Sequence, residues 1–227
     1  MAKRKPRLAD LKRKSPNQDR SKQTVDNIIA AADKILSRDG IDSLTIRSIA
    51  ETAGISLGSL YDYFPNKQAV LYRIYEKRLD LLLQIFDEAT SEEDPPASFE
   101  AAFDKYLQLA RDAKYPTRVD IELRNAIHRD PRLAEMTKHY EESLTERYVN
   151  LLQRYGSDWS EADLRMFAEY AHGIDHLNYR LQAQGTRDAR KTSGHIATHL
   201  FVSLARYCGA TKILGANEDS TEEADHA

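Results

Sequence analysis

Residues 54–58 have the types and spacing that nucleophilic catalysis would require. Gly54-Ile55-Ser56-Leu57-Gly58 matches G-x-S-x-G, the pattern around the reactive serine of many hydrolases. That chemistry needs a β-strand running into a sharp turn that exposes the serine, whereas residues 45–53 have a helical pattern. The sequence also lacks a G-x-x-x-x-G-K phosphate loop and an H-E-x-x-H zinc motif. We therefore predict that the protein is not an enzyme and needs no cofactor.

Two pairs of histidines have the spacing of metal ligands. His172 and His176 are four residues apart, as are His195 and His199. On a helix this spacing places both imidazoles of a pair on one face. Four such nitrogens together would bind zinc or nickel, if the two faces packed against each other. Ordinary hydrogen bonding by these histidines is the alternative.

The elements that position these residues are predicted to be helices, so we expect an all-α fold. Apolar residues recur with a period near 3.6 from residue 25 to 36, with Ser21 as a plausible N-cap. No alternating run is long enough to indicate a sheet. Further helices are expected at 45–53, from 56 to before Pro65, 67–93, 97–112, 117–128, 131–155, 161–184 and 191–208.

Composition excludes some classes of protein and indicates a partner. The 227 residues carry 33 Lys+Arg and 36 Asp+Glu, for a net charge of -3. Residues 1–22 hold nine basic side chains against two acidic ones, so one end of the chain suits a polyanion. The longest run of Leu, Ile or Val is residues 81–83, which is too short to cross a membrane. A single cysteine, Cys208, excludes an internal disulfide, and we expect a cytoplasmic protein.

The short helices on either side of Gly54-Ile55-Ser56 form a helix-turn-helix pattern. This pattern needs a small residue at the turn, apolar residues between the helices and an exposed second helix. The packing residues are Leu44, Ile49, Ala50, Ala53, Ile55, Leu60 and Phe64, and the outward positions are Leu57, Gly58, Ser59, Tyr61, Asp62 and Tyr63. The pattern favours DNA binding, although a purely structural helical hairpin has the same turn.

Residues 44–71 contain the part of the helix-turn-helix pattern that can be compared with a known family. They read Leu-Thr-Ile-Arg-Ser-Ile-Ala-Glu-Thr-Ala-Gly-Ile-Ser-Leu-Gly-Ser-Leu-Tyr-Asp-Tyr-Phe-Pro-Asn-Lys-Gln-Ala-Val-Leu. This segment resembles the signature of the TetR family of bacterial transcriptional regulators, and the close match covers residues 21–81. The resemblance implies a DNA-binding domain over 21–81, with its helix-turn-helix at about 45–64. An effector-binding and dimerisation domain over 82–212 would follow, between disordered tails at 1–20 and 213–227.

The resemblance also implies which residues contact a double-stranded DNA operator. Arg47 would reach a guanine edge or a phosphate, and the Tyr61 hydroxyl would donate to a phosphate. Leu57 offers only packing or contact with a thymine methyl group, so it departs from a polar readout. The full set implied to bind DNA is Thr45, Arg47, Ser56, Leu57, Gly58, Ser59, Tyr61, Tyr63 and Lys67.

By the same resemblance the C-terminal helices bind a small-molecule effector and form a homodimer. The last two helices would form the dimer interface, where histidines usually hydrogen-bond, so we predict no metal. Aromatic residues with interleaved polar ones suit an aromatic or amphipathic ligand. The candidate pocket residues are Phe103, Tyr106, Asn125, His128, Tyr140, Tyr170 and Asn178. A ligand-responsive repressor is the favoured interpretation, and an activator or an all-α small-molecule binding protein remains an alternative.

Overall fold

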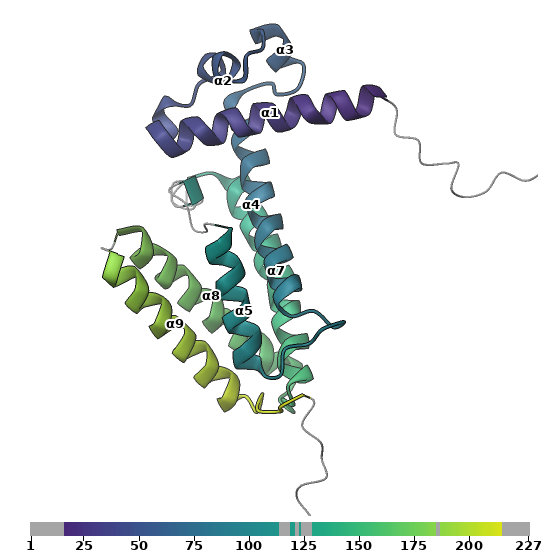
Figure 1. Ribbon diagram of the computed structural model, residues 1–227, viewed down its shortest axis with the longest axis vertical. Coiled ribbons are helices and arrows are strands. Elements are labelled where there is room, and N and C mark those ends of the chain that lie inside the picture. Colours follow the sequence, from purple (N-terminus) through teal and green to yellow (C-terminus); the bar gives the residue numbers. More distant parts are fainter. Residues whose placement is uncertain (1–15, 114–118, 121–122, 124–128, 185–186, 215–227) are drawn as a thin grey trace, which may run out of the picture. The chain divides into compact units, whose positions relative to one another are not determined.

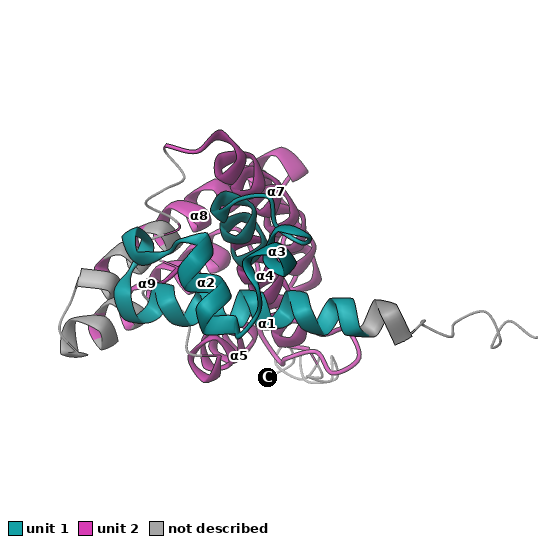
Figure 2. Cartoon of the chain, turned by 90° about the horizontal axis from the view of Figure 1, so that it is seen from above, with its two compact units in different colours: residues 1–74 teal, residues 75–227 magenta. Residues whose placement is uncertain are grey.

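The computed structural model describes residues 16–113, 119–120, 123, 129–184 and 187–214. Within these ranges the chain forms eight α-helices and one short 3₁₀ helix, without a strand, so the prediction of an all-α fold is confirmed. The chain divides into two compact units, residues 1–74 and 75–227 (Figures 1 and 2). None of the described helices is both long and apolar enough to cross a bilayer.

Unit 1 consists of helices packed around the apolar stripe of the first one. The elements are α1 (Pro16–Asp39), η2 (Ile41–Ser43), α2 (Ile46–Ala53), α3 (Leu57–Tyr61) and the start of α4 (Lys67–Ala89). Helix α1 packs against η2 and α2, and α2 packs against α3. The buried side chains are Ile28, Ile29, Ala31, Ala32, Ile35, Leu36, Leu44, Ile49, Ala50, Leu60, Phe64, Val70, Leu71 and Ile74. The stripe predicted over 25–36 is thus the core of this unit.

Two helix boundaries differ from those expected. Helix α1 begins at Pro16, so Ser21 lies inside it and is not the N-cap. Proline suits the first turn of a helix, and no breaker separates it from Ser21. Helix α4 ends at Ala89 rather than near Glu93, and the Thr90 hydroxyl that follows donates to the Phe86 carbonyl in its last turn, at 2.8 Å.

In its described part, unit 2 contains the rest of α4 and four further helices with defined bounds. They are α5 (Phe99–Asp112), α7 (Pro131–Arg154), α8 (Glu161–Gln184) and α9 (Arg187–Tyr207). Helix α7 packs against α8, and α9 packs against both α8 and α5 (Figure 1). Most of the helix expected over 117–128 lies outside the described residues, although residues 119, 120 and 123 are helical.

Aromatic rings fill much of the interior of unit 2. Phe103 stacks on Phe201 with ring centroids 4.5 Å apart, and Phe86 meets Tyr148 edge to face at 5.2 Å. Edge-to-face and offset-stacked pairs add to the stabilisation that burial of such large rings provides. Tyr155 is fully buried, and its hydroxyl donates to the Pro96 carbonyl at 2.7 Å. This bond joins α7 to the loop before α5.

Ion pairs fasten α4 to α7 at the surface of unit 2. The Arg147 guanidinium donates to both carboxylate oxygens of Asp87, at 2.6 and 2.9 Å. This forked bond raises the pKa of Arg147 above its ordinary value. Arg154 donates to the Thr90 carbonyl at 2.6 Å and pairs with Glu92 at 2.9 Å. The C-terminal end of α4 is therefore held against α7.

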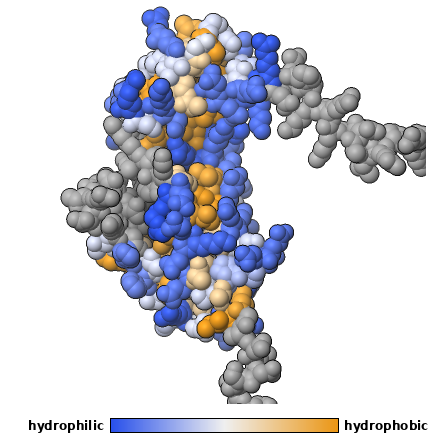
Figure 3. All heavy atoms as spheres, viewed as in Figure 1, coloured by the Kyte–Doolittle hydropathy of each residue, from blue (hydrophilic) through white to orange (hydrophobic). Residues whose placement is uncertain are grey.

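Polar side chains cover most of the face in Figure 3, with some hydrophobic residues among them.

Candidate nucleic-acid interface

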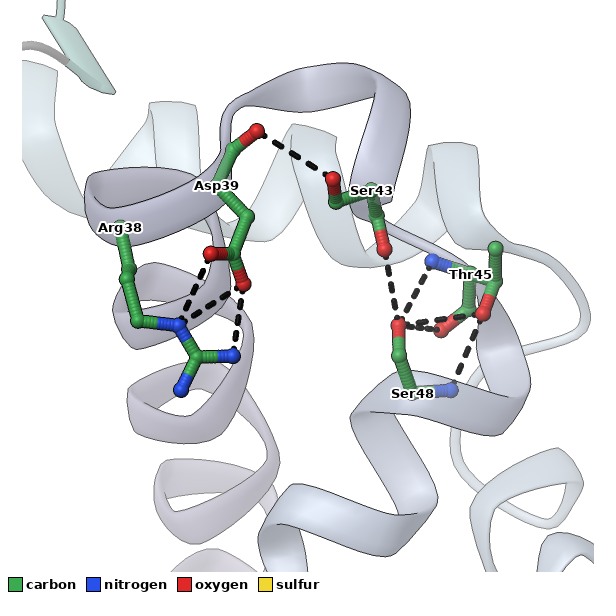
Figure 4. Close-up of polar contacts among 5 residues, drawn as sticks. All are labelled: Arg38, Asp39, Ser43, Thr45 and Ser48. Atoms are coloured by element: carbon green, nitrogen blue, oxygen red, sulfur yellow. Dashed lines mark hydrogen bonds and ion pairs between the residues drawn. The ribbon is translucent and has the colours of Figure 1, made fainter.

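The start of α2 is held by a reciprocal pair of hydrogen bonds. Thr45 is the N-cap: its hydroxyl oxygen accepts from the Ser48 backbone N–H at 3.0 Å, and the Ser48 hydroxyl oxygen accepts from the Thr45 N–H at 3.0 Å. The Ser48 hydroxyl also lies 3.0 Å from the Ser43 carbonyl oxygen, and Ser43 bonds back to the Asp39 carbonyl (Figure 4). These bonds fix the angle at which the chain passes from α1 into α2.

The turn of the motif is set by Gly54. Its φ of 67° is in the left-handed region, and its N–H bonds to the Ala50 and Glu51 carbonyls at the end of α2. A Cβ added there would have nothing within 4 Å, so the glycine is required by backbone conformation and not by lack of space. The Asn27 side chain on α1 donates to the Ala53 carbonyl at 2.9 Å, which gives a partner to the last backbone carbonyl of α2.

Helix α3 is short and presents most of its residues to solvent. Ser56 is its N-cap and accepts from the Ser59 N–H at 3.0 Å, which leaves the Ser56 hydroxyl proton for another acceptor. Leu60 is buried, whereas Leu57 and Gly58 are exposed and Ser59 is half-buried. The helix ends at Tyr61, so Tyr63 lies beyond it in the turn that follows and is half-buried. The sequence pattern, by contrast, predicts a helix that continues to the residue before Pro65.

Two exposed side chains have the chemistry of DNA contacts. Arg47 is exposed in the first turn of α2, and Tyr61 at the end of α3 is 55% exposed. Neither makes a hydrogen bond or an ion pair with the described part of the chain. Arg38, by contrast, donates to the Asp39 carboxylate at 2.6 Å, which raises the pKa of Arg38. The guanidinium of Arg47 is thus available to a phosphate or a guanine edge.

Helix α4 adds an N-terminus with a cation at its first position. Asn66 accepts from the Ala69 N–H at 2.9 Å, as the sequence predicted, and Lys67 opens the helix with a half-buried side chain. Free N–H groups and the helix dipole favour an anion at such an end. The arrangement suits a phosphate of a nucleic-acid backbone.

Sequence reasoning missed two residues that position this surface, Ser48 and Asn27. The signal for Ser48 was present, since it lies three residues after the N-cap Thr45, where a side chain can return a hydrogen bond. Asn27 gave no sequence signal, because its acceptor is 26 residues away on another helix.

Comparison with known proteins identifies this region. The model of the family "Bacterial regulatory proteins, tetR family" matches residues 28–74, which hold α2, the Gly54 turn and α3. Residues 28–74 are therefore a tetR-family domain. This is a family of regulatory proteins and not of enzymes, and in this chain Ser56 caps a helix that follows another helix. The prediction that residues 54–58 are not a hydrolase site is therefore confirmed.

Curated relatives of this chain are transcriptional regulators. The uncharacterized HTH-type transcriptional regulator YfiR of Bacillus subtilis (strain 168) is 30% identical over 136 residues, which are 59% of this chain and 65% of YfiR. The HTH-type transcriptional repressor KstR2 of Mycolicibacterium smegmatis is 33% identical over 104 residues, 42% of this chain and 50% of KstR2. The chain thus spans less than two thirds of the length of either relative.

Solved structures share the fold over most of the chain. A TetR transcription regulator from Haloarcula marismortui has a TM-score of 0.69 at 15% identity, covering 82% of this chain and 98% of that one. The structure of RolR in complex with resorcinol has a TM-score of 0.54 at 16% identity, covering 84% and 95%. The helical body after residue 74 is thus similar in fold to those of known tetR-family members.

The predicted pocket residues fall into three groups. Phe103 and Tyr140 are buried and Tyr106 is half-buried. Tyr170, also a candidate pocket residue, is 63% exposed. The reason is the register of α8, whose buried face holds residues 164, 167, 168 and 171 and turns position 170 outward. Asn125, His128 and the side chain of Asn178 lie outside the described residues.

The histidine pairs are in different environments. His172 is buried, with its Nε2 atom 3.0 Å from the Thr145 hydroxyl oxygen and its ring 6.2 Å from that of Tyr148. His195 and His199 are exposed on α9, and the side chain of His176 lies outside the described residues. Among the described residues no group of three or more His, Cys, Asp or Glu is placed to hold a metal ion. The described histidines therefore form no four-nitrogen site.

Proposed function

We propose that this tetR-family chain is a sequence-specific transcriptional repressor acting in the cytoplasm. In this proposal it binds a palindromic operator as a homodimer through residues 21–81. A small molecule bound by residues 82–212 releases it. The observation that carries DNA binding is the pair of capped helices α2 and α3 joined by Gly54, with Arg47, Gly58 and Tyr61 exposed on them.

Unit 1, which we call the head, would supply two kinds of DNA contact. Arg47 has the donors for a bidentate bond to guanine, and exposed Gly58 lets a base edge or a phosphate approach the backbone of α3. Tyr61, the Ser56 hydroxyl and the start of α4 suit phosphates, which fix the register on the duplex. Thr45 caps α2, and the remaining proposed contacts are Leu57, Ser59, Tyr63 and Lys67.

The homodimer is supported by two exposed apolar stripes. Along α8 they include Met166, Tyr170, Leu177 and Leu181, and along α9 Ile196, Leu200 and Tyr207. Their spacing of four or seven residues places each set on one face of its helix, and α8 packs against α9. Two such pairs from a symmetric dimer would bury these stripes in a four-helix arrangement. This proposal also accounts for the exposure of Tyr170.

The effector proposal rests on the interior of unit 2. Its rings surround few polar side chains, of which the Thr145–His172 pair and the Tyr75–Thr137 pair, with hydroxyls 2.7 Å apart, are buried. Aromatic walls with a few fixed polar groups suit a small aromatic ligand. The similar fold of RolR is known in complex with resorcinol, a molecule of this class.

Release would follow from a change in the separation of the two heads. Helix α4 is continuous, with residues 67–74 in unit 1 and 75–89 in unit 2. Successive major grooves on one face of DNA are about 34–36 Å apart, so a dimer fits only at the matching spacing. An effector that favours another spacing would shift the population away from the DNA-bound form.

Selection of bound DNA from a random pool tests the proposal. We expect an enriched palindrome, and Arg47→Ala should weaken binding to it by about 1–3 kcal/mol at fixed salt. Arg38→Ala removes the same charge from the same unit, but Arg38 is bound to Asp39, so this matched control should bind almost as wild type. No enriched palindrome, or equal losses in the two variants, would contradict sequence-specific reading by this surface.

A further inference from the structure

The exposed face of α9 carries a histidine pair that neither DNA binding nor the proposed effector site uses. His195 and His199 are one helical turn apart and are both exposed. Neither imidazole makes a hydrogen bond or an ion pair within the ranges that the structure describes. Their spacing puts the two side chains on the same side of the helix, with Cβ atoms about 5–6 Å apart.

From this arrangement we infer, in contrast to the prediction of no metal made from the sequence, that His195 and His199 form a two-nitrogen site for a divalent transition-metal ion such as Zn²⁺ or Ni²⁺. Each imidazole supplies one nitrogen at about 2.0–2.1 Å from the ion, a distance that two side chains one turn apart reach together. Imidazole ligands select zinc, nickel and copper over magnesium and calcium, which prefer oxygen. Water completes the coordination, since this face is exposed.

The contrast with His172 explains why the site is on α9 alone. The His172 Nε2 atom is buried and pairs with the Thr145 hydroxyl, so metal binding there would break an internal hydrogen bond. The α9 pair has no such cost in the described structure.

Calorimetric titration of the untagged full chain with Zn²⁺ or Ni²⁺ alone tests the site. We expect one ion per chain at this site, and each of His195→Ala and His199→Ala should weaken binding at least about tenfold, because the chelate is lost. His139 is also exposed but lies on α7, so His139→Ala is the matched control and should bind as wild type. Unchanged affinity in the His195→Ala/His199→Ala double variant would overturn the proposal.

Moving the second histidine tests the spacing itself. In a His195→Ala background, Ser203→His places an exposed residue four positions after His199 and should restore binding. Thr192→His in the same background gives the same number of imidazoles, but seven positions from His199 and about 10.5 Å along the axis, which is too far for one ion. Recovery by the second variant and not the first would contradict chelation by one helical turn. Half an ion per chain would also contradict it, since a bridge between copies would then bind the metal.

Discussion

The two units place their chemically active side chains in opposite environments. In unit 1 Arg47, Gly58 and Tyr61 are exposed on short helices whose ends are fixed by local caps and a glycine turn. In unit 2 the aromatic and polar side chains proposed to meet an effector lie in the packed interior, and their partners are distant in sequence. A substitution in the head can therefore alter binding without altering the fold. A substitution in the interior of unit 2 alters both the binding and the fold.

The contrast between the two units is tested most strongly at the exposed apolar stripe of α9, which holds Ile196, Leu200 and Tyr207 and belongs to the surface of unit 2. Leu200→Glu puts a charge on a side chain that is 45% exposed, so the monomer should still fold. If this stripe is the dimer interface, the protein should become monomeric. Operator affinity should then fall by about 100-fold or more, because the two half-sites are no longer linked. Sedimentation and gel-shift titration measure the two effects.

Asn150→Glu is the matched control, since it adds the same charge at an exposed position of α7. It should leave both the dimer and the operator affinity unchanged. A dimer of normal affinity from Leu200→Glu would locate the interface elsewhere on the chain.

How far the sequence predicted each unit follows from the same contrast. Thr45, Gly54 and Ser56 act on backbone groups within a few residues, so their roles as caps and turn were visible in the sequence. The exposure of Tyr170 was not visible in the sequence because α8 is apolar on two faces, and periodicity alone does not say which face is inside. The Tyr155–Pro96 bond spans 59 residues and gave no local signal. The DNA-contact and pocket residues remain predictions.

The basic residues before α1 test whether the head's affinity comes from the described surface alone. Because α1 begins at Pro16, deletion of residues 2–15 leaves that helix intact. We expect weaker binding to operator and random DNA alike. The slope of log affinity against log salt should fall by about 0.9 for each phosphate that is no longer neutralised. Gel shifts at several salt concentrations measure this slope.

Preference among operator variants should be almost unchanged by this deletion, because the proposed base contacts lie on α2 and α3. A full salt slope in the truncated protein would show that residues 2–15 contribute nothing to binding.

Two tyrosines, one in each unit, separate the two roles directly. Tyr61→Phe removes an exposed hydroxyl, so folding should not change while operator binding weakens by about 1–3 kcal/mol. Tyr155→Phe removes a buried donor and leaves the Pro96 carbonyl without it, so the free energy of unfolding should fall by about 1 kcal/mol. Denaturant unfolding measures the stability of each variant, and gel shifts measure the operator affinity of each. If Tyr61→Phe destabilised the fold and spared binding, the assignment of this side chain to DNA would be wrong.

Two glycines within the helix-turn-helix test the comparison at the level of single methyl groups. Gly54→Ala forces a side chain into the left-handed region, at a cost in folding stability of about 1–2 kcal/mol, although it has free space around it. At Gly58 an added Cβ would meet only the Ser56 hydroxyl oxygen, at 3.9 Å, so Gly58→Ala should stabilise the free head by about 0.5–1 kcal/mol. If DNA approaches the backbone of α3 there, the same methyl group should weaken operator binding. A variant that is both more stable and normal in binding would leave Gly58 without a role in DNA contact. Weaker binding despite a gain in stability would have no explanation within the free protein, and would identify the surface that meets the duplex.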